Sequence, residues 1–234
     1  MDRITRKELK TDKFALEVGH TVEYFEQHRG AIIKYGSIAV VVVVALVAYY
    51  FYARNQRVQR QSELHTAIQI QDAQISPAPV DNSFRTYTTV EERTKAARKA
   101  FQDIATQHAG TEEGLAGKYY LGTIAADEGK LTEAEKWLRE VSDSGNADYA
   151  SLGKLALAPI YAGEGRAGDA ERLLRSVMDK PTLFVSKDQA TITLARLIAK
   201  SRPAEARKLL EPLRTERSAV SRAAITALAE ISGR

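Results

Sequence analysis

The chain has 234 residues, a formal net charge of +4 and no cysteine. The absence of cysteine excludes disulfides, thiolate metal sites and catalysis by cysteine. Of the 34 basic and 30 acidic residues, seven and six lie in residues 1–34, which leaves an excess of three positive charges for the rest. So small an excess, with no basic stripe, predicts no nucleic-acid partner.

Residues 1–34 form a charged tail. Thr11 and Asp12 are suitable helix caps, and apolar residues follow them at helical spacing, namely Phe14, Val18, Val22 and Phe25. This spacing predicts a short amphipathic helix. Two interpretations stay open, docking on a partner and an inert, solvated helix.

An apolar run of 19 residues extends from Tyr35 to Ala53 without a charged side chain. As a helix it would be about 28 Å long, close to the hydrocarbon thickness of a bilayer. Lys34 and Arg54 flank the run, and one end carries an aromatic collar of Tyr49, Tyr50, Phe51 and Tyr52. A strand is seldom so long, and the collar occupies the place of a signal-peptide cleavage site. The run 35–53 therefore predicts a retained transmembrane helix.

The orientation of this helix depends on how basic residues are counted. Over the whole tail, their excess predicts a cytoplasmic N-terminus. Within 20 residues of the run, Arg29 and Lys34 are outnumbered by Arg54, Arg57 and Arg60. We expect the N-terminus inside and the larger domain, residues 54–234, outside.

Helical segments repeat with a period of 36 residues in the larger domain. Ala134, Ala170 and Ala206 are 36 residues apart, and each is followed by Leu after four residues and by Val or Leu after seven. These positions share one helical face, and such a period is typical of stacked helical hairpins. The predicted repeats are 112–145, 149–181 and 186–215, with glycines such as Gly129 and Gly145 closing helices and a capping helix over 218–232.

Residues 57–108 are interpreted as a degenerate first repeat. Ala97, Phe101 and Ile104 match the small, large and apolar positions of the later repeats. A long loop over 75–90, which contains Pro77 and Pro79, would separate its two helices. The predicted fold class is therefore all-α, an N-terminal transmembrane helix followed by an α-solenoid of about four helical hairpins.

The repeats resemble the tetratricopeptide repeat. One copy is indicated by Leu121-Gly122, Ala134, Leu138 and Val141, and the next by Leu157-Ala158, Tyr161, Ala170, Leu174, Val177 and Pro181. The pattern departs from the family in its period, in Lys118 and Lys154 at the first aromatic position, and in Thr193-Leu194 in place of Leu-Gly. The resemblance implies that the first helix of each pair lines a concave binding side.

The layout also resembles a bacterial family, the ancillary SecYEG translocon subunit (YfgM-like) family. The matching segment is the junction VEYFEQHRGAIIKYGSIAVVVVVALVAYYFYARNQ. The resemblance implies a single-pass protein of the bacterial inner membrane with a periplasmic repeat domain. Its partners would be translocon subunits, chaperones or exported clients.

No residue pattern predicts catalysis. The histidines are scattered, no nucleotide-binding, hydrolase or zinc-protease motif occurs, and Trp137 is interpreted as packing between helices. We expect no enzyme activity, cofactor, metal or small-molecule substrate. Transfer of the concave positions gives a partner-binding set: Tyr119, Thr123, Asp127, Leu152, Leu155 and Pro159. For Leu152 and Leu155 an ordinary core role is the alternative.

The expected function is therefore a membrane-anchored scaffold for protein–protein interaction that assists protein export, at the Sec translocon or with periplasmic chaperones. A structural assembly factor of another cell-envelope complex, of the secretion or division machinery, is the alternative.

Overall fold

A computed structural model describes residues 29–76, 86–214 and 219–232 of the chain. The predicted amphipathic helix around Phe14 and Phe25 lies outside these residues. The chain divides into two compact units, one up to Val58 and one from Gln59 onward.

The first unit contains the beginning of helix α2 (Arg29–Gln71). Every residue from 35 to 53 is solvent-exposed, with 67% of Val41 and 70% of Tyr49 accessible. An 18-residue window of this helix has a mean hydropathy of 2.4 and no buried residue. By length and composition it is therefore a candidate membrane span.

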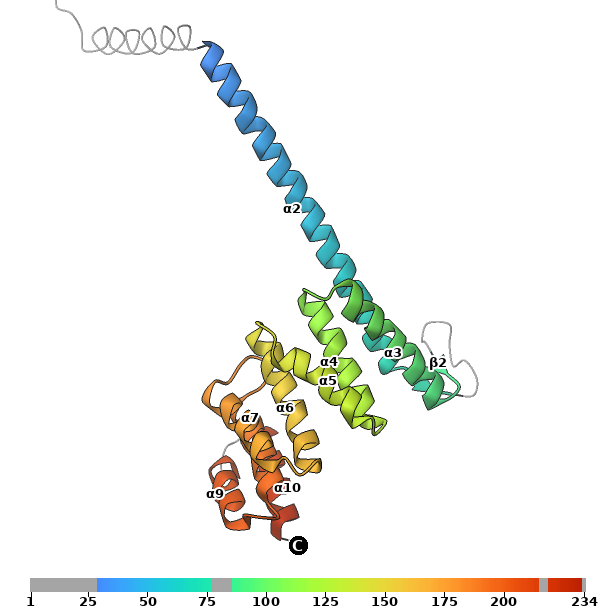
Figure 1. The fold of residues 1–234 in the computed structure, drawn as a ribbon, viewed down its shortest axis with the longest axis vertical. Helices are drawn as coiled ribbons and strands as arrows, with labels where there is room; N and C mark the ends of the chain where they lie inside the picture. The colour runs from blue at the N-terminus through green and yellow to red at the C-terminus, as the bar shows by residue number, and fades with distance from the viewer. Residues whose placement is uncertain (1–28, 77–85, 215–218, 233–234) are drawn as a thin grey trace, which may run out of the picture. The chain divides into compact units, whose positions relative to one another are not determined.

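The second unit is a succession of antiparallel helical pairs, which Figure 1 shows in colour order from green to red. After the end of α2, its helices are α3 (Val90–Gln107), α4 (Glu112–Asp127), α5 (Leu131–Ser142), α6 (Ala147–Gly163), α7 (Ala167–Asp179), α8 (Lys187–Ile198), α9 (Pro203–Arg214) and α10 (Ala219–Ser232). Each helix contacts the next, and the first helices of successive pairs also meet, α4 with α6 and α6 with α8. The described residues therefore confirm the all-α fold of stacked helical pairs.

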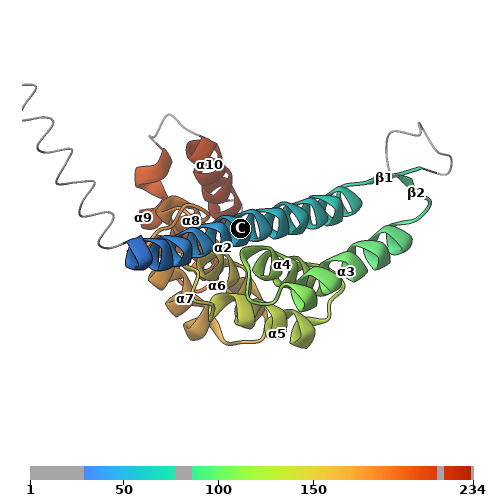
Figure 2. The same ribbon diagram turned by 90° about the horizontal axis from the view of Figure 1, so that it is seen from above.

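The predicted loop over 75–90 is not wholly irregular. Two-residue strands β1 (Gln74–Ile75) and β2 (Thr86–Tyr87) pair in parallel between the end of α2 and the start of α3 (Figure 2). Backbone bonding continues past the strands, since Ser76 N–H donates to the Tyr87 carbonyl at 2.9 Å. The sequence did not predict this pairing, because a strand of two residues is too short to show an alternating apolar pattern.

Local signals set the helix ends. Thr111 and Asn146 accept hydrogen bonds from backbone N–H groups of the first turns of α4 and α6, which satisfies donors that no helical carbonyl reaches. Gly129 and Gly165 follow these two helices with φ of +75° and +78°, the left-handed conformation that glycine adopts without strain. The prediction for Gly145 was wrong, because α5 ends at Ser142 and Gly145 has no positive φ.

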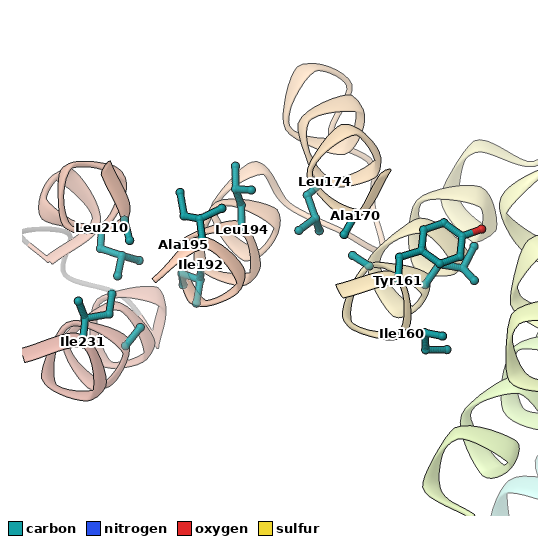
Figure 3. Close-up of a cluster of buried hydrophobic side chains, with 14 of the residues drawn as sticks. Ile160, Tyr161, Ala170, Leu174, Ile192, Leu194, Ala195, Leu210 and Ile231 are labelled. Atoms are coloured by element: carbon teal, nitrogen blue, oxygen red, sulfur yellow. The ribbon is translucent and has the colours of Figure 1, made fainter. Parts of the chain in front are cut away.

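The repeated alanines and leucines form the core. Ala134, Ala170 and Ala206 are completely buried, as are Leu174 and Leu210. One cluster of buried residues, which we call the main cluster, runs from α4 to α10. Figure 3 shows its side chains in a row between successive helices. Because neighbouring repeats share this cluster, no pair buries its apolar face alone. A second cluster joins the end of α2 to α3 and α4, with Trp137 packed against it.

Two glycines bring α4 and α6 close to the helix before each. A Cβ added at Gly117 would lie 2.9 Å from the carbonyl oxygen of Phe101, and one at Gly153 would lie 2.5 Å from the backbone nitrogen of Ser142. The two glycines are 36 residues apart, so they are a feature of the repeat. Both glycines therefore allow contact between the backbones of consecutive helices.

Candidate functional site

The six predicted partner-binding residues lie on α4 and α6, the first helices of two successive pairs. Tyr119 is half-buried against the main cluster, and its ring meets the Tyr120 ring edge-on at 5.8 Å. Burial and the neighbouring Tyr120 raise the pKa of Tyr119. The Thr123 hydroxyl donates to the Tyr120 carbonyl at 3.0 Å, and Asp127 is exposed at the end of α4. The α4 part of the set therefore presents one exposed carboxylate and a half-buried tyrosine.

On α6 the two leucines pack inward. Leu152 and Leu155 contact the small cluster of Val177, Val185 and Ala190. This packing corresponds to the alternative interpretation, in which the two leucines are ordinary core residues. Leu155, like Tyr119, also packs against the main cluster, whereas Pro159 is exposed within α6. On α6 the set therefore presents one exposed position, Pro159, beside two leucines that pack inward.

The sequence did not reveal two clefts beside α6, each of about 440 Å³. The first cleft has walls from α5 and α7 and a floor from α6; it is lined by Arg139, Ser142, Asp143, Lys154, Leu157, Tyr161, Arg166, Asp169, Arg172, Leu173 and Ser176. The second is lined by Ala147, Ala150, Ser151, Lys154, Ser176, Val177, Asp179, Lys180, Pro181 and Thr182. Lys154 and Ser176 line both, so the two clefts adjoin at these residues. We call the joined clefts the Lys154 groove.

All three arginines that line this groove, Arg139, Arg166 and Arg172, are held by carboxylates. Arg166 Nη1 lies 3.0 Å from Glu135 Oε1, and its Nε lies 3.3 Å from Asp169 Oδ2. Arg139 binds Glu135 as well and donates to the Tyr161 hydroxyl at 3.0 Å. The hydrogen bond from Arg166 is the main reason that the pKa of Glu135 is lowered. These pairs fix the wall of the groove between α5 and α7.

The guanidinium of Arg166 also covers the Tyr161 ring, with its central carbon 3.7 Å from the ring centroid. Tyr161 is buried, and its hydroxyl points away from the row of core side chains in Figure 3. The ring therefore contributes to both the core and the groove floor. Cation–π contact and hydrogen bonding together hold one rigid end of the groove.

One loop beside the second cleft is also firmly held. Thr182 Oγ1 bonds Ser151 Oγ at 2.7 Å, and Leu183 N–H donates to Asp148 Oδ1 at 3.0 Å. Leu183 itself is 91% exposed, and the Phe184 ring meets Tyr149 edge-on at 5.2 Å. The loop is therefore a fixed border of the cleft.

No group of three or more histidine, aspartate or glutamate side chains is placed to hold a metal ion among the residues that the structure describes. The imidazole of His108 instead contacts Glu63, with 2.7 Å between Nε2 and Oε2.

A comparison with protein families matches residues 23–187 to the family described as "Tetratricopeptide repeat-like domain". The matched range includes the apolar run and the helices up to the start of α8. A search of the curated proteins and a search of the solved structures gave no match.

Proposed function

The chain belongs to the tetratricopeptide repeat-like family, and from this membership we propose that it is a membrane-anchored scaffold that binds other proteins. Domains of this kind mediate protein–protein interactions through the surface of stacked helices. The proposal includes no enzymatic activity, cofactor or small-molecule substrate.

The exposed apolar helix is the observation that carries the anchoring part of the proposal. From residue 35 to residue 53 no side chain is buried, although most are valine, alanine or aromatic. An apolar surface of this extent is unfavourable in water, and the length fits the hydrocarbon layer. A bilayer around residues 35–53 would remove this surface from water.

The finer part of the proposal is assistance to protein export. It rests on the resemblance of the junction before and within the apolar run to the YfgM-like family. In this proposal the N-terminus is cytoplasmic, the repeat domain is periplasmic, and the partners are translocon subunits, chaperones or exported chains. The anchor would hold the repeat domain near its partner, so that weak contacts act at high effective concentration.

Anchoring and orientation are tested on the full chain in bacterial membranes. The chain is expected to stay in the membrane pellet after carbonate extraction. Carbonate releases proteins that surface charge holds on the membrane, but it does not extract a helix that spans the bilayer. Protease added to spheroplasts is expected to digest the repeat domain. Release by carbonate would refute the anchor, and protection of the repeat domain would refute the orientation.

Partner binding is tested with a photo-crosslinking residue at Asp127, which is exposed and lies on α4, as does half-buried Tyr119. The matched control carries the same residue at Arg207, which is exposed on α9. Adducts specific to position 127 with translocon subunits, chaperones or exported chains are expected. A single envelope complex captured in fixed proportion would favour the assembly-factor alternative, and no adduct at any position of the repeats would refute the scaffold.

A further inference from the structure

The repeats allow a comparison of one lysine with its counterpart. Lys118 on α4 and Lys154 on α6 are 36 residues apart and occupy the same position of successive repeats. Lys118 Nζ lies 2.7 Å from Oε2 of Glu140 on α5. The counterpart of Glu140 is Ser176 on α7, whose hydroxyl donates to the Leu173 carbonyl at 2.7 Å. The second repeat therefore keeps the lysine and lacks its carboxylate.

Lys154 has no ion pair with any residue that the structure describes. It is half-buried, and it lines both clefts where they meet. The neighbouring cations differ, because Arg139 and Arg166 share Glu135, and Arg172 binds Asp169. Lys154 is thus the half-buried cation of the groove floor that has no carboxylate partner in the described part of the domain.

A half-buried cation gains more from a carboxylate than an exposed one does, because water solvates it less. The other ions of the groove without a partner among the described residues are Asp143, Asp179 and Lys180, and all three are exposed to solvent. They lie at the rim, and the two aspartates disfavour a densely charged polyanion. Apolar side chains flank the lysine on both sides, Leu157 and Leu173 in the first cleft and Val177 and Pro181 in the second.

We propose that the Lys154 groove binds a segment of a partner protein that carries an aspartate or glutamate between small apolar residues. The partner carboxylate takes the place that Glu140 occupies beside Lys118. The apolar neighbours contact the flanking surfaces of the two clefts. This inference rests on the proposed scaffold function and names a second surface, apart from the concave positions around Tyr119.

The first step of the test identifies a segment. A photo-crosslinking residue is placed at Asp143, on the rim of the first cleft, in the full chain in membranes. The captured peptide is sequenced, and it is synthesised in two forms, with its acidic residue and with the matching amide. Capture of nucleic acid or lipid alone at this position would overturn the proposal. So would the absence of adducts here while position 127 still gives them, an outcome that leaves the scaffold function standing.

The second step measures binding of the two labelled peptides to the purified full chain in detergent by fluorescence anisotropy. The acidic peptide is expected to bind at least about tenfold more tightly than its amide form, a difference of about 1.4 kcal/mol. Lys154→Met is expected to bind both forms equally. A preference that persists in Lys154→Met, or equal binding of both peptides to the unaltered chain, would overturn the assignment of the carboxylate to Lys154.

Ser176→Glu provides a variant that preserves the lysine. It restores the pair of the preceding repeat, so the intramolecular carboxylate occupies Lys154 and competes with the peptide. Its melting temperature is expected to equal or exceed that of the unaltered chain, while the acidic peptide loses at least about tenfold in affinity. Arg207→Gln on α9 is the control and should change neither value. Full peptide affinity in Ser176→Glu would overturn the proposal.

Discussion

Gly153 is the position at which the close packing of the repeats is most directly tested. An alanine Cβ there would lie 2.5 Å from the backbone nitrogen of Ser142 and 2.9 Å from the carbonyl oxygen of Leu138. Both atoms belong to the backbone of α5, so no side-chain rotation relieves the contact. Gly153→Ala must therefore move α6 away from α5.

The magnitude follows from two opposing effects. Overpacking of a well-packed interior costs about 1–3 kcal/mol, and alanine in place of glycine inside a helix gains about 1 kcal/mol. Because the contacts are with backbone, we expect the cost to lie toward the upper end. Gly153→Ala should then lower the free energy of unfolding by about 1–2 kcal/mol. In a domain of this size that corresponds to a fall of about 2–8 °C in melting temperature.

Urea unfolding of the full chain in mild detergent, followed by circular dichroism, measures the effect. Gly168→Ala on α7 is the matched control, since an added Cβ there meets nothing within 4 Å and the backbone is not left-handed. Gly122→Ala is the intermediate case, because its Cβ meets the Leu138 side chain rather than backbone. If Gly153→Ala were as stable as Gly168→Ala, the close approach of α5 and α6 would be refuted.

Two further substitutions test the pH dependence and the helix ends. The side chains of Arg202 and Arg175 lower the pKa of Glu171, so its contribution to stability is complete above the ordinary carboxyl pKa and is lost as the pH falls through the lowered value. Glu171→Gln should therefore be less stable than the unaltered chain at pH 7, by about 1 kcal/mol or less because the site is partly exposed. Urea titrations at several pH values should show the difference shrink and vanish as the pH falls through the lowered pKa of Glu171, and a pH-independent difference would contradict the ion-pair explanation. Gly165→Ala should lower the free energy of unfolding by about 1–2 kcal/mol, because φ is +78° there and a Cβ is strained in that region. Stability equal to that of the unaltered chain would argue against a left-handed residue after α6.

Sequence periodicity was sufficient for the core because apolar spacing reports which side a helix buries. The positions of Ala134, Leu138 and Val141, at 0–1% exposure, follow from spacing alone. The match to the tetratricopeptide repeat-like family covers the helices in which this pattern is clearest. Spacing could not show that Leu152 and Leu155 face the core rather than a concave surface, because both sides of α6 are apolar.

The clefts were beyond sequence reasoning for a different reason. Their walls depend on how far apart α5 and α7 lie, which is a property of the packed stack. One signal was nevertheless present in the sequence. Gly117 and Gly153 stand 36 residues apart, and glycine inside a helix is unfavourable unless it permits a close approach. The repeated glycine therefore signals the backbone contact at Gly153 between α5 and α6, two of the helices that line the first cleft.

Contacts that recur with the period of 36 residues hold the stack together. Glu135 Oε1 lies 3.0 Å from Arg166 Nη1, and one repeat later Glu171 binds Arg202 in the same manner. Each pair joins the second helix of one repeat to the start of the second helix of the next. Apolar contacts between helices have no preferred direction. An ion pair at the same position of each repeat therefore helps to fix how one helix lies along its neighbour.

Toward the N-terminus this series of glutamate–arginine pairs is interrupted, and other carboxylates provide the ion pairs. Arg98 stands where the later repeats have glutamate, and Lys130 stands where they have arginine, so two cations would meet. Glu128 lies between them, with Oε2 at 2.6 Å from Arg98 Nη2 and at 2.7 Å from Lys130 Nζ. Arg98 also lies 2.7 Å from Oε1 of Glu133, so two carboxylates balance the two cations within the domain. At this point of the stack, ion pairs with other carboxylates therefore replace the missing glutamate–arginine pair.

Lys154 represents the opposite case. Ser176 stands where the preceding repeat has Glu140, so Lys154 has no carboxylate partner among the described residues, in a half-buried position between two clefts. Arg207 on α9 also lacks an ion pair there, but it is exposed, so water balances its charge at little cost. In the unbound chain the ammonium of Lys154 is solvated by water and, unlike that of Lys118, is not paired with a described carboxylate. A partner carboxylate would supply that pair, which is why the groove, rather than the regular part of the stack, is the surface at which we expect selectivity.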